Sequence, residues 1–246
     1  MRKYESMIVS LSDNLCNIPI LRGELESSVV LFHKEDKDEI TKLQDWLWPA
    51  NDFDSWTVQR NDWCNQHTHK WFTYCNNFGV ALQAGGNCGL YPRMLAERFN
   101  MVYTFEPNPL AFYCLVTNCQ KGNIIKSQMA LSEKSKMVGM RLFGDNIGMT
   151  QVVQTSQPMI PAISIDSLDL PALDFLALDT EGCEPEIFRG ALNTIKKYHP
   201  LIIAENFHAK YHDPSILTSL GYIFHGTSAM DAIWVWGGKN MFASID

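Results

Sequence analysis

Residues 80–89 read VALQAGGNCG, residues 90–99 read LYPRMLAERF, and residues 101–107 read MVYTFEP. A short apolar run meets a glycine cluster, a helical pattern follows, and a second apolar run ends at the carboxylate of Glu106. This order is typical of a β-α-β unit that binds a nucleoside cofactor. The glycines allow a sharp turn and a close approach of the backbone to a ligand, because a Cβ would clash there. Glu106 follows the glycines by about 20 residues, where a carboxylate can accept the ribose hydroxyls.

The size and composition of the chain favour one α/β domain with an extension. Its 246 residues are too few for two large domains, and a hydrophobic content of 46% is ordinary for a protein with a buried core. The net charge of -7 argues against non-specific nucleic-acid binding, since that function needs a basic face. We therefore expect no nucleic-acid partner.

The seven cysteines are odd in number and include no C-x-x-C pair. No secretory leader and no long apolar segment is evident, so we expect reduced thiols in a cytoplasmic protein without a membrane partner. Neither a disulfide framework nor a zinc site is expected. The sequence does not define the oligomeric state.

Residues 1–75 differ from the rest of the chain, and we expect them to form a tryptophan-rich extension on a domain of residues 76–246. Asp36 and Glu39 form a capping-box pattern that predicts a helix through about Leu47. Five tryptophans lie between residues 46 and 71. We favour a cap whose rings pack on the main domain. The alternative is that some rings line an acceptor pocket, since indole offers a flat apolar face.

From residue 78 onward, strand and helix patterns alternate, which indicates an α/β fold with a mostly parallel sheet. Expected strands cover residues 78–83, 101–106, 124–131, 137–143, 173–178 and 201–204, and expected helices cover residues 91–99, 109–121, 185–197 and 214–220. Residues 222–225 and 233–236 suit an antiparallel hairpin. Residues 144–161 are rich in turn-forming residues, and we interpret them as a long mobile loop that acts as a lid over the acceptor.

Polar side chains gather where the parallel strands should end: Gln83, Glu106, Asp179 with Glu181, and Glu205 with Asn206. In an open α/β sheet the ligand lies outside the carboxyl ends of the strands, so these side chains should line one crevice. Several carboxylates repel a pyrophosphate, whereas they attract the sulfonium and ammonium groups of S-adenosylmethionine. The chemistry therefore favours methyl transfer over hydride transfer.

The sequence resembles the FkbM family of S-adenosylmethionine-dependent methyltransferases over roughly residues 78–236. The matching pieces, in the family's order, are residues 85–91 (GGNCGLY), 105–109 (FEPNP), 130–132 (ALS), 165–168 (IDSL), 178–184 (LDTEGCE) with Gly190, and 204–205 (AE). The resemblance implies a Rossmann-like three-layer sandwich. Its sheet would be seven-stranded and mostly parallel, with an antiparallel hairpin at the C-terminus.

The resemblance also implies a cofactor site: Gly85, Gly86, Asn87 and Gly89 in the loop, Glu106 and Pro107 at the ribose, and Gln128 and Met129 at the adenine. Gln83 stands where the family usually has an acidic residue that helps to hold the methionine end. Its amide oxygen offers an acceptor without a charge. Asp179 is the alternative contact for the ammonium group.

Asp179 and Glu181 would lie beside the methionine end and the acceptor. Methyl transfer to a hydroxyl requires alignment and removal of a proton. His208, just past the strand at residues 201–204, is our candidate base, and an ordinary loop histidine is the alternative reading. A divalent metal ion on Asp179, Glu205 and Asn206 is a further hypothesis that we do not favour.

The sequence thus predicts an S-adenosylmethionine-dependent O-methyltransferase that acts on a hydroxyl of a glycan or a small metabolite. A non-catalytic binding protein is an alternative, motivated by Gln83. An NAD-dependent oxidoreductase is a third reading, supported by the near-match A-x-G-x-x-G at residues 84–89.

Overall fold

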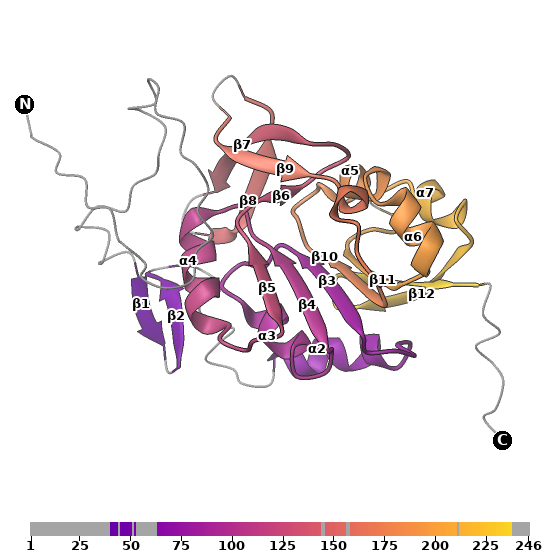
Figure 1. Cartoon of the computed structure of the whole chain (residues 1–246), viewed down its shortest axis with the longest axis horizontal. Helices are drawn as coiled ribbons and strands as arrows, with labels where there is room; N and C mark the ends of the chain where they lie inside the picture. Colours follow the sequence, from indigo (N-terminus) through magenta and orange to yellow (C-terminus); the bar gives the residue numbers. More distant parts are fainter. Residues whose placement is uncertain are drawn as a thin grey trace, which may run out of the picture.

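A seven-stranded sheet runs through the computed structural model (Figure 1), which describes residues 40–43, 45–50, 52, 63–143, 146–155, 158–210 and 212–237. The strand order is β12-β13-β11-β10-β3-β4-β5. Five of the strands pair in parallel: β5 (Ile124–Ser127), β4 (Met101–Phe105), β3 (Val80–Ala84), β10 (Phe175–Leu178) and β11 (Leu201–Glu205). An antiparallel hairpin of β12 (Tyr222–Ser228) and β13 (Asp231–Trp236) completes the sheet. The predicted α/β fold class with its C-terminal hairpin is confirmed.

Helices cover both faces of this sheet and make it the middle of three layers. They are α2 (Trp63–Phe72), α3 (Leu90–Leu95), α4 (Pro109–Asn118), α5 (Glu184–Arg189), α6 (Leu192–Tyr198) and α7 (Ser215–Thr218). On one face Leu82 and Leu176 belong to a core shared with α5, α6 and α7. On the other face Ala81 and Phe175 pack with α2, α3 and α4. Across the described ranges, every helix is too short or too polar to span a membrane.

The helix expected at residues 185–197 is in fact two helices, because Gly190 lies against another part of the chain. A Cβ on Gly190 would come within 2.1 Å of the backbone oxygen of Ser132. The second helix then starts under Asp166, which lies in the short 3-10 helix η3 (Ile165–Leu168). The Asp166 carboxylate accepts hydrogen bonds from the backbone N–H groups of Asn193 and Thr194 at 3.1 and 2.8 Å. Asp166 is therefore a helix-capping residue.

A second sheet replaces the predicted loop at residues 144–161. It has the order β6-β9-β7-β8 and consists of β6 (Ala130–Leu131), β7 (Lys136–Phe143), β8 (Asn146–Val153) and β9 (Ile160–Ile163). The prediction of a mobile loop is wrong because β8 pairs antiparallel with β7 along most of its length, and a lid function stays a prediction. The strand expected at residues 124–131 is likewise divided into β5 and β6.

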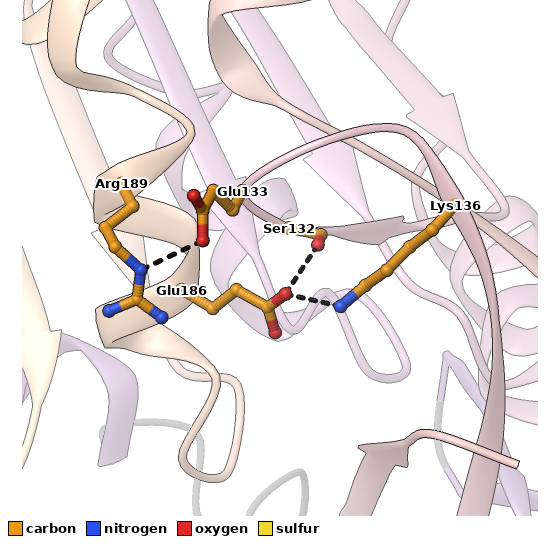
Figure 2. Close-up of polar contacts among 5 residues, drawn as sticks. All are labelled: Ser132, Glu133, Lys136, Glu186 and Arg189. Atoms are coloured by element: carbon orange, nitrogen blue, oxygen red, sulfur yellow. Dashed lines mark hydrogen bonds and ion pairs between the residues drawn. The ribbon is translucent and has the colours of Figure 1, made fainter.

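Ionic contacts join this small sheet to α5, as Figure 2 shows. Glu186 accepts hydrogen bonds from the Lys136 ammonium and, at 3.0 Å, from the Ser132 hydroxyl. Partial burial of Glu186 acts to raise the pKa of its carboxyl group, but the Lys136 and Ser132 hydrogen bonds lower that pKa overall. Arg189 pairs with Glu133 at 3.1 Å. These contacts hold the small sheet over the end of the main sheet where α5 begins.

The chain before α2 forms a hairpin where a helix was predicted. Strands β1 (Ile40–Leu43) and β2 (Trp46–Pro49) pair antiparallel and lie beside α4 (Figure 1). The helix prediction is wrong because the backbone of Leu47 bonds outward: its N–H donates to Asn118 Oδ1, and its oxygen accepts from Asn118 Nδ2, both at 2.8 Å. The capping-box residues lie outside the described residues, and the domain boundary at residue 75 stays a prediction.

The substitution Gly190→Ala tests the close contact that divides the two helices. We expect it to lower the free energy of unfolding by about 1–3 kcal/mol, because the new methyl group would overlap the backbone of Ser132. Gly122→Ala is the matched control, since a Cβ there meets no atom within 4 Å. Urea unfolding followed by circular dichroism measures both variants. Equal stability of the two would contradict the packing described here.

Candidate functional site

A cavity of about 300 Å³ opens where the parallel strands of the main sheet end. It lies beside β3 and β10, the point at which the order of parallel strands reverses and where ligands of open α/β sheets bind. Its described lining residues include the ends of the central strands, several residues of β8, and Trp48 of β2. The cavity therefore has one wall from each of the two sheets.

The glycine turn after β3 forms one side of the cavity. The backbone N–H groups of Gly85 and Gly86 both donate to the carbonyl of Phe105, at 3.1 and 3.0 Å. Gly85 has a φ of 81°, and a Cβ on it would lie 1.7 Å from the backbone oxygen of Asp179. Only glycine allows the ends of β3 and β10 to meet at this distance. Gly89, with a φ of 100°, ends the turn at the start of α3.

Glu106 is the residue that ties the turn to the next helix. Its carboxylate accepts the backbone N–H of Asn87 and that of Asn108, each at 2.7 Å, and the residue is 7% exposed. Burial raises the pKa of Glu106 to about 7, although the two backbone hydrogen bonds act in the opposite direction. Glu106 and Pro107 both line the cavity, as the proposed ribose contact requires.

Gln83 has a different place from the one that the sequence suggested. It is 1% exposed, and it is not among the described residues that line the cavity. Its amide group donates to the backbone oxygens of Ala84 and Gly85 at 3.1 and 2.7 Å, and its oxygen accepts from the Thr104 hydroxyl at 2.8 Å. The Gln83 side chain thus stabilises the glycine turn through hydrogen bonds to its backbone. This placement corrects the expectation that Gln83 contacts the methionine end.

The adenine side of the predicted site is present in part. Met129, in the turn between β5 and β6, lines the cavity. Its neighbour Gln128 is exposed and is not among the lining residues described. The predicted contact of Gln128 therefore has no support in this arrangement.

Acidic side chains converge at the ends of β10 and β11. Asp179, Glu181 and Glu205 are half-buried, all three line the cavity, and each has a carboxylate oxygen within 4.8 Å of the others. Burial raises the pKa of Asp179 well above its usual range, and Glu205 and Asp231 add to that effect. Burial also raises the pKa of Asp231 to about 7. A side-chain hydrogen bond between Asp179 and Glu205 adds to the rise in the pKa of Asp179 and opposes the rise in the pKa of Glu205.

Glu184 and the predicted base His208 are not among the described residues that line the cavity. Glu184 begins α5 and is 1% exposed, and it accepts from the backbone N–H and the hydroxyl of Thr180 at 2.8 and 2.7 Å. His208 stacks on Phe224 with 5.6 Å between the ring centroids and is not among the described lining residues. The structure therefore does not bring His208 to the acceptor site. The carboxyl pair of Asp179 and Glu205 takes its place as the candidate base.

The metal hypothesis named Asp179, Glu205 and Asn206, whereas the structure groups Glu181 with the two carboxylates. Asn206 turns its amide nitrogen toward Glu205, at 3.3 Å. Oxygen ligands at this spacing suit a divalent cation, but an acidic group of this kind is common without one. Metal binding stays a hypothesis.

Several lining residues were not identified from the sequence. They are Trp48, Cys88, Leu90, Tyr91, Ile147, Gly148, Thr150, Val152, Thr180, Cys183, Ile187 and Met230. Trp48 had a signal in the tryptophan-rich stretch, for which an acceptor pocket was the alternative reading. The residues of β8 belong to the segment that was interpreted as a lid over the acceptor, but they line the cavity as part of a strand.

Comparison with known proteins gives one family match and one related protein. The family described as the methyltransferase FkbM domain matches residues 93–225. The hexuronic acid methyltransferase AglP of Haloferax volcanii is 29% identical over 148 residues, which cover 57% of this chain and 60% of that protein. The chain thus spans less than two thirds of the length of this relative.

Solved structures show more distant likenesses. The methyltransferase FkbM from Methylobacillus flagellatus is 17% identical with a TM-score of 0.45, over 64% of this chain and 44% of that one. A TehB-like SAM-dependent methyltransferase from Corynebacterium glutamicum is 9% identical with a TM-score of 0.42, over 73% of this chain and 94% of that one. The fold assignment rests on the strand order of the sheet, and the family assignment rests on the match to residues 93–225. Because that match covers more than half of the chain, this protein belongs to the FkbM methyltransferase family.

Proposed function

We propose that this chain binds S-adenosylmethionine and catalyses methylation of a hydroxyl group on a sugar or another small metabolite. The proposal is carried by the lining of a single cavity. The buried Glu106 carboxylate lies beside the glycine turn, and the acidic group of Asp179, Glu181 and Glu205 lies at the ends of β10 and β11. The name of the Haloferax relative, a hexuronic acid methyltransferase, supports a sugar as the acceptor.

The glycine turn and the adjacent Glu106 offer hydrogen-bond acceptors to a ligand. Asn87 Oδ1 is buried and has no hydrogen-bond partner in the described structure, although Asn87 lines the cavity. A buried acceptor without a donor costs free energy, so a hydroxyl or ammonium group of a ligand would stabilise it. Glu106 beside it would accept the ribose hydroxyls, since a carboxylate has capacity beyond its two backbone donors.

The charge of the cavity favours a cationic cofactor. Its described lining includes Glu106, Asp179, Glu181 and Glu205, and no lysine, arginine or histidine among those residues. Carboxylates attract a sulfonium and an ammonium group, and they repel the pyrophosphate of NAD. S-adenosylmethionine therefore fits this donor set, and the oxidoreductase alternative fits it poorly.

The carboxyl pair of Asp179 and Glu205 would act on the hydroxyl group of the acceptor. When bound, S-adenosylmethionine supplies an activated methyl group. The acceptor hydroxyl must lose its proton as its oxygen becomes an ether, and an ionised oxygen of the pair Asp179 and Glu205 can accept that proton. Their mutual hydrogen bond also fixes both side chains in the wall of the cavity, which helps to align the acceptor.

Gln83 motivates a second candidate, a protein that binds the cofactor without turning it over. The absence of a carboxylate at this position removes one negative charge near the turn. Binding of S-adenosylhomocysteine without methyl transfer to any member of a broad acceptor panel would favour this candidate.

Substitution of Glu106 tests the cofactor site. We expect Glu106→Gln to weaken the binding of S-adenosylhomocysteine by about tenfold to a hundredfold, because a charged acceptor for the ribose is lost. Titration calorimetry gives the dissociation constants, and NAD should give no binding heat. Glu133→Gln is the matched control, since Glu133 pairs with Arg189 with half of its side chain exposed. Unchanged affinity in Glu106→Gln would contradict the ribose assignment.

The stability of the ligand-free protein should depend on the protonation of Glu106. Its pKa is raised from 4.5 to about 7 on folding, so its stabilising contribution is complete below about pH 4.5 and is lost as the pH rises through 7. Native protein should therefore lose on the order of 3 kcal/mol relative to Glu106→Gln between pH 4.5 and 7. Urea unfolding of both proteins across this range measures the difference. A constant difference would show that burial does not shift this group.

Substitution of Asp179 and Glu205 tests the proton acceptor. We expect the double variant Asp179→Asn with Glu205→Gln to lower the rate of transfer from tritiated S-adenosylmethionine to hydroxylated sugars by about a hundredfold or more, because it lacks both ionisable groups of the pair. Binding of S-adenosylhomocysteine should persist. Loss of transfer in His208→Ala, with the double variant still active, would assign the base to His208 instead. Activity that survives excess EDTA would exclude the metal hypothesis.

A further inference from the structure

The β1–β2 hairpin lies outside the family match but reaches the cavity. The match begins at residue 93, whereas the hairpin occupies residues 40–49. Trp48 of β2 is 1% exposed and lines the cavity. Its ring packs in a small core with Cys88 of the glycine turn and Ala111 of α4. The hairpin therefore contacts the glycine turn and α4, the two segments that Glu106 connects.

A buried carboxylate holds Trp48 to the opposite wall. Asp52 is 4% exposed; its Oδ2 accepts from Trp48 Nε1, and its Oδ1 accepts from the backbone N–H of Ile147, both at 2.7 Å. Ile147 belongs to β8 and lines the cavity. Burial of a carboxylate is costly unless it is hydrogen-bonded, and both oxygens of Asp52 have a donor. A hairpin that only packed on the main domain through apolar contacts would need no buried carboxylate.

A buried amide holds the same hairpin to the glycine turn. Asn118 of α4 is 6% exposed and pairs with both backbone groups of Leu47. Its Nδ2 also donates to the backbone oxygen of Cys88 at 2.7 Å. One residue thus positions the hairpin relative to the turn, and Asp52 positions it relative to β8.

We propose that the β1–β2 hairpin completes the cofactor cavity of this chain, with Trp48 as part of its wall and Asp52 and Asn118 as positioning residues. The inference rests on the proposed binding of S-adenosylmethionine. Trp48 lies on the nucleoside side, because its neighbours Cys88 and Ala111 flank Asn87 and the Asn108 cap of α4. The hairpin therefore contributes to affinity for the adenosine part of the cofactor.

The substitution Asp52→Asn tests this role with S-adenosylhomocysteine as the probe. An amide keeps the size of the side chain but turns an N–H group toward one of its two donors, which frees either Trp48 or Ile147. We expect affinity by titration calorimetry to fall by about tenfold. Asp166→Asn is the matched control: it also removes a carboxylate that accepts two N–H groups, in this case both from the backbone, but Asp166 is not among the described residues that line the cavity. It should lower the melting temperature and leave affinity within about twofold.

A second variant decides the result if Asp52→Asn does not fold. Trp48→Phe keeps an aromatic ring but leaves Asp52 Oδ2 without its donor, so affinity should again fall while Asp166→Asn binds normally. If the folded Asp52→Asn or Trp48→Phe variant binds S-adenosylhomocysteine as tightly as the native chain, the inference about the hairpin is wrong, while the proposed cofactor stands. An equal loss in Asp166→Asn overturns it as well, because the effect would then follow stability. No binding by the native chain overturns both the inference and the proposed cofactor.

Discussion

The Glu106 carboxylate accepts one backbone N–H from each of the two segments that flank the nucleoside side of the cavity. One donor is Asn87 in the glycine turn, and the other is Asn108, whose own side chain caps α4. The turn, the strand end and the helix start are therefore fixed relative to one carboxylate. The other walls are arranged around this contact: β10 meets the turn at Gly85, and Trp48 of the hairpin packs with Cys88. Burial of Glu106 without these donors would be too costly for a stable fold.

Negative charge is the second constraint on the cavity. Asp179, Glu181 and Glu205 lie close together; burial raises the pKa of both Asp179 and Glu205, and the neighbouring charge of Glu205 adds to the rise at Asp179. The raised pKa of Asp179 favours its protonated form, which reduces the repulsion between these carboxyl groups in the free protein. A cationic ligand would reduce it in another way, which couples cofactor charge to the ionisation of the proposed base. The same charge makes an anionic ligand group such as a pyrophosphate unfavourable.

The central part of the fold could be predicted from the sequence because its patterns are local. The glycine cluster, the apolar strand at residues 175–178 and the carboxylates after each strand all follow from short stretches of chain. The prediction was wrong where distant contacts decide the structure. Residues 40–49 carry a helical spacing of apolar side chains, but Asn118 pairs with the backbone of Leu47 from 71 positions away and stabilises a strand. Residues 144–161 contain turn formers, but pairing with β7 makes a strand of β8.

The candidate site could also be predicted only in part from the sequence. Glu106, Asp179 and Glu181 could be placed because each follows a strand, and all three line the cavity. Gln83 also follows the strand pattern, but its side chain bonds beneath the turn to Thr104 and to two backbone oxygens. Trp48 and Ile147 could not be placed, since their position depends on hydrogen bonds to a single buried carboxylate, Asp52.

A crystal structure of the native chain with S-adenosylhomocysteine tests the central claim most directly. The account predicts the ligand in the cavity between the two sheets, with both ribose hydroxyls on Glu106 and the adenosine beside Trp48. The sulfur would point toward Asp179 and Glu205. A ligand bound elsewhere, or bound here with its ribose away from Glu106, would contradict the account.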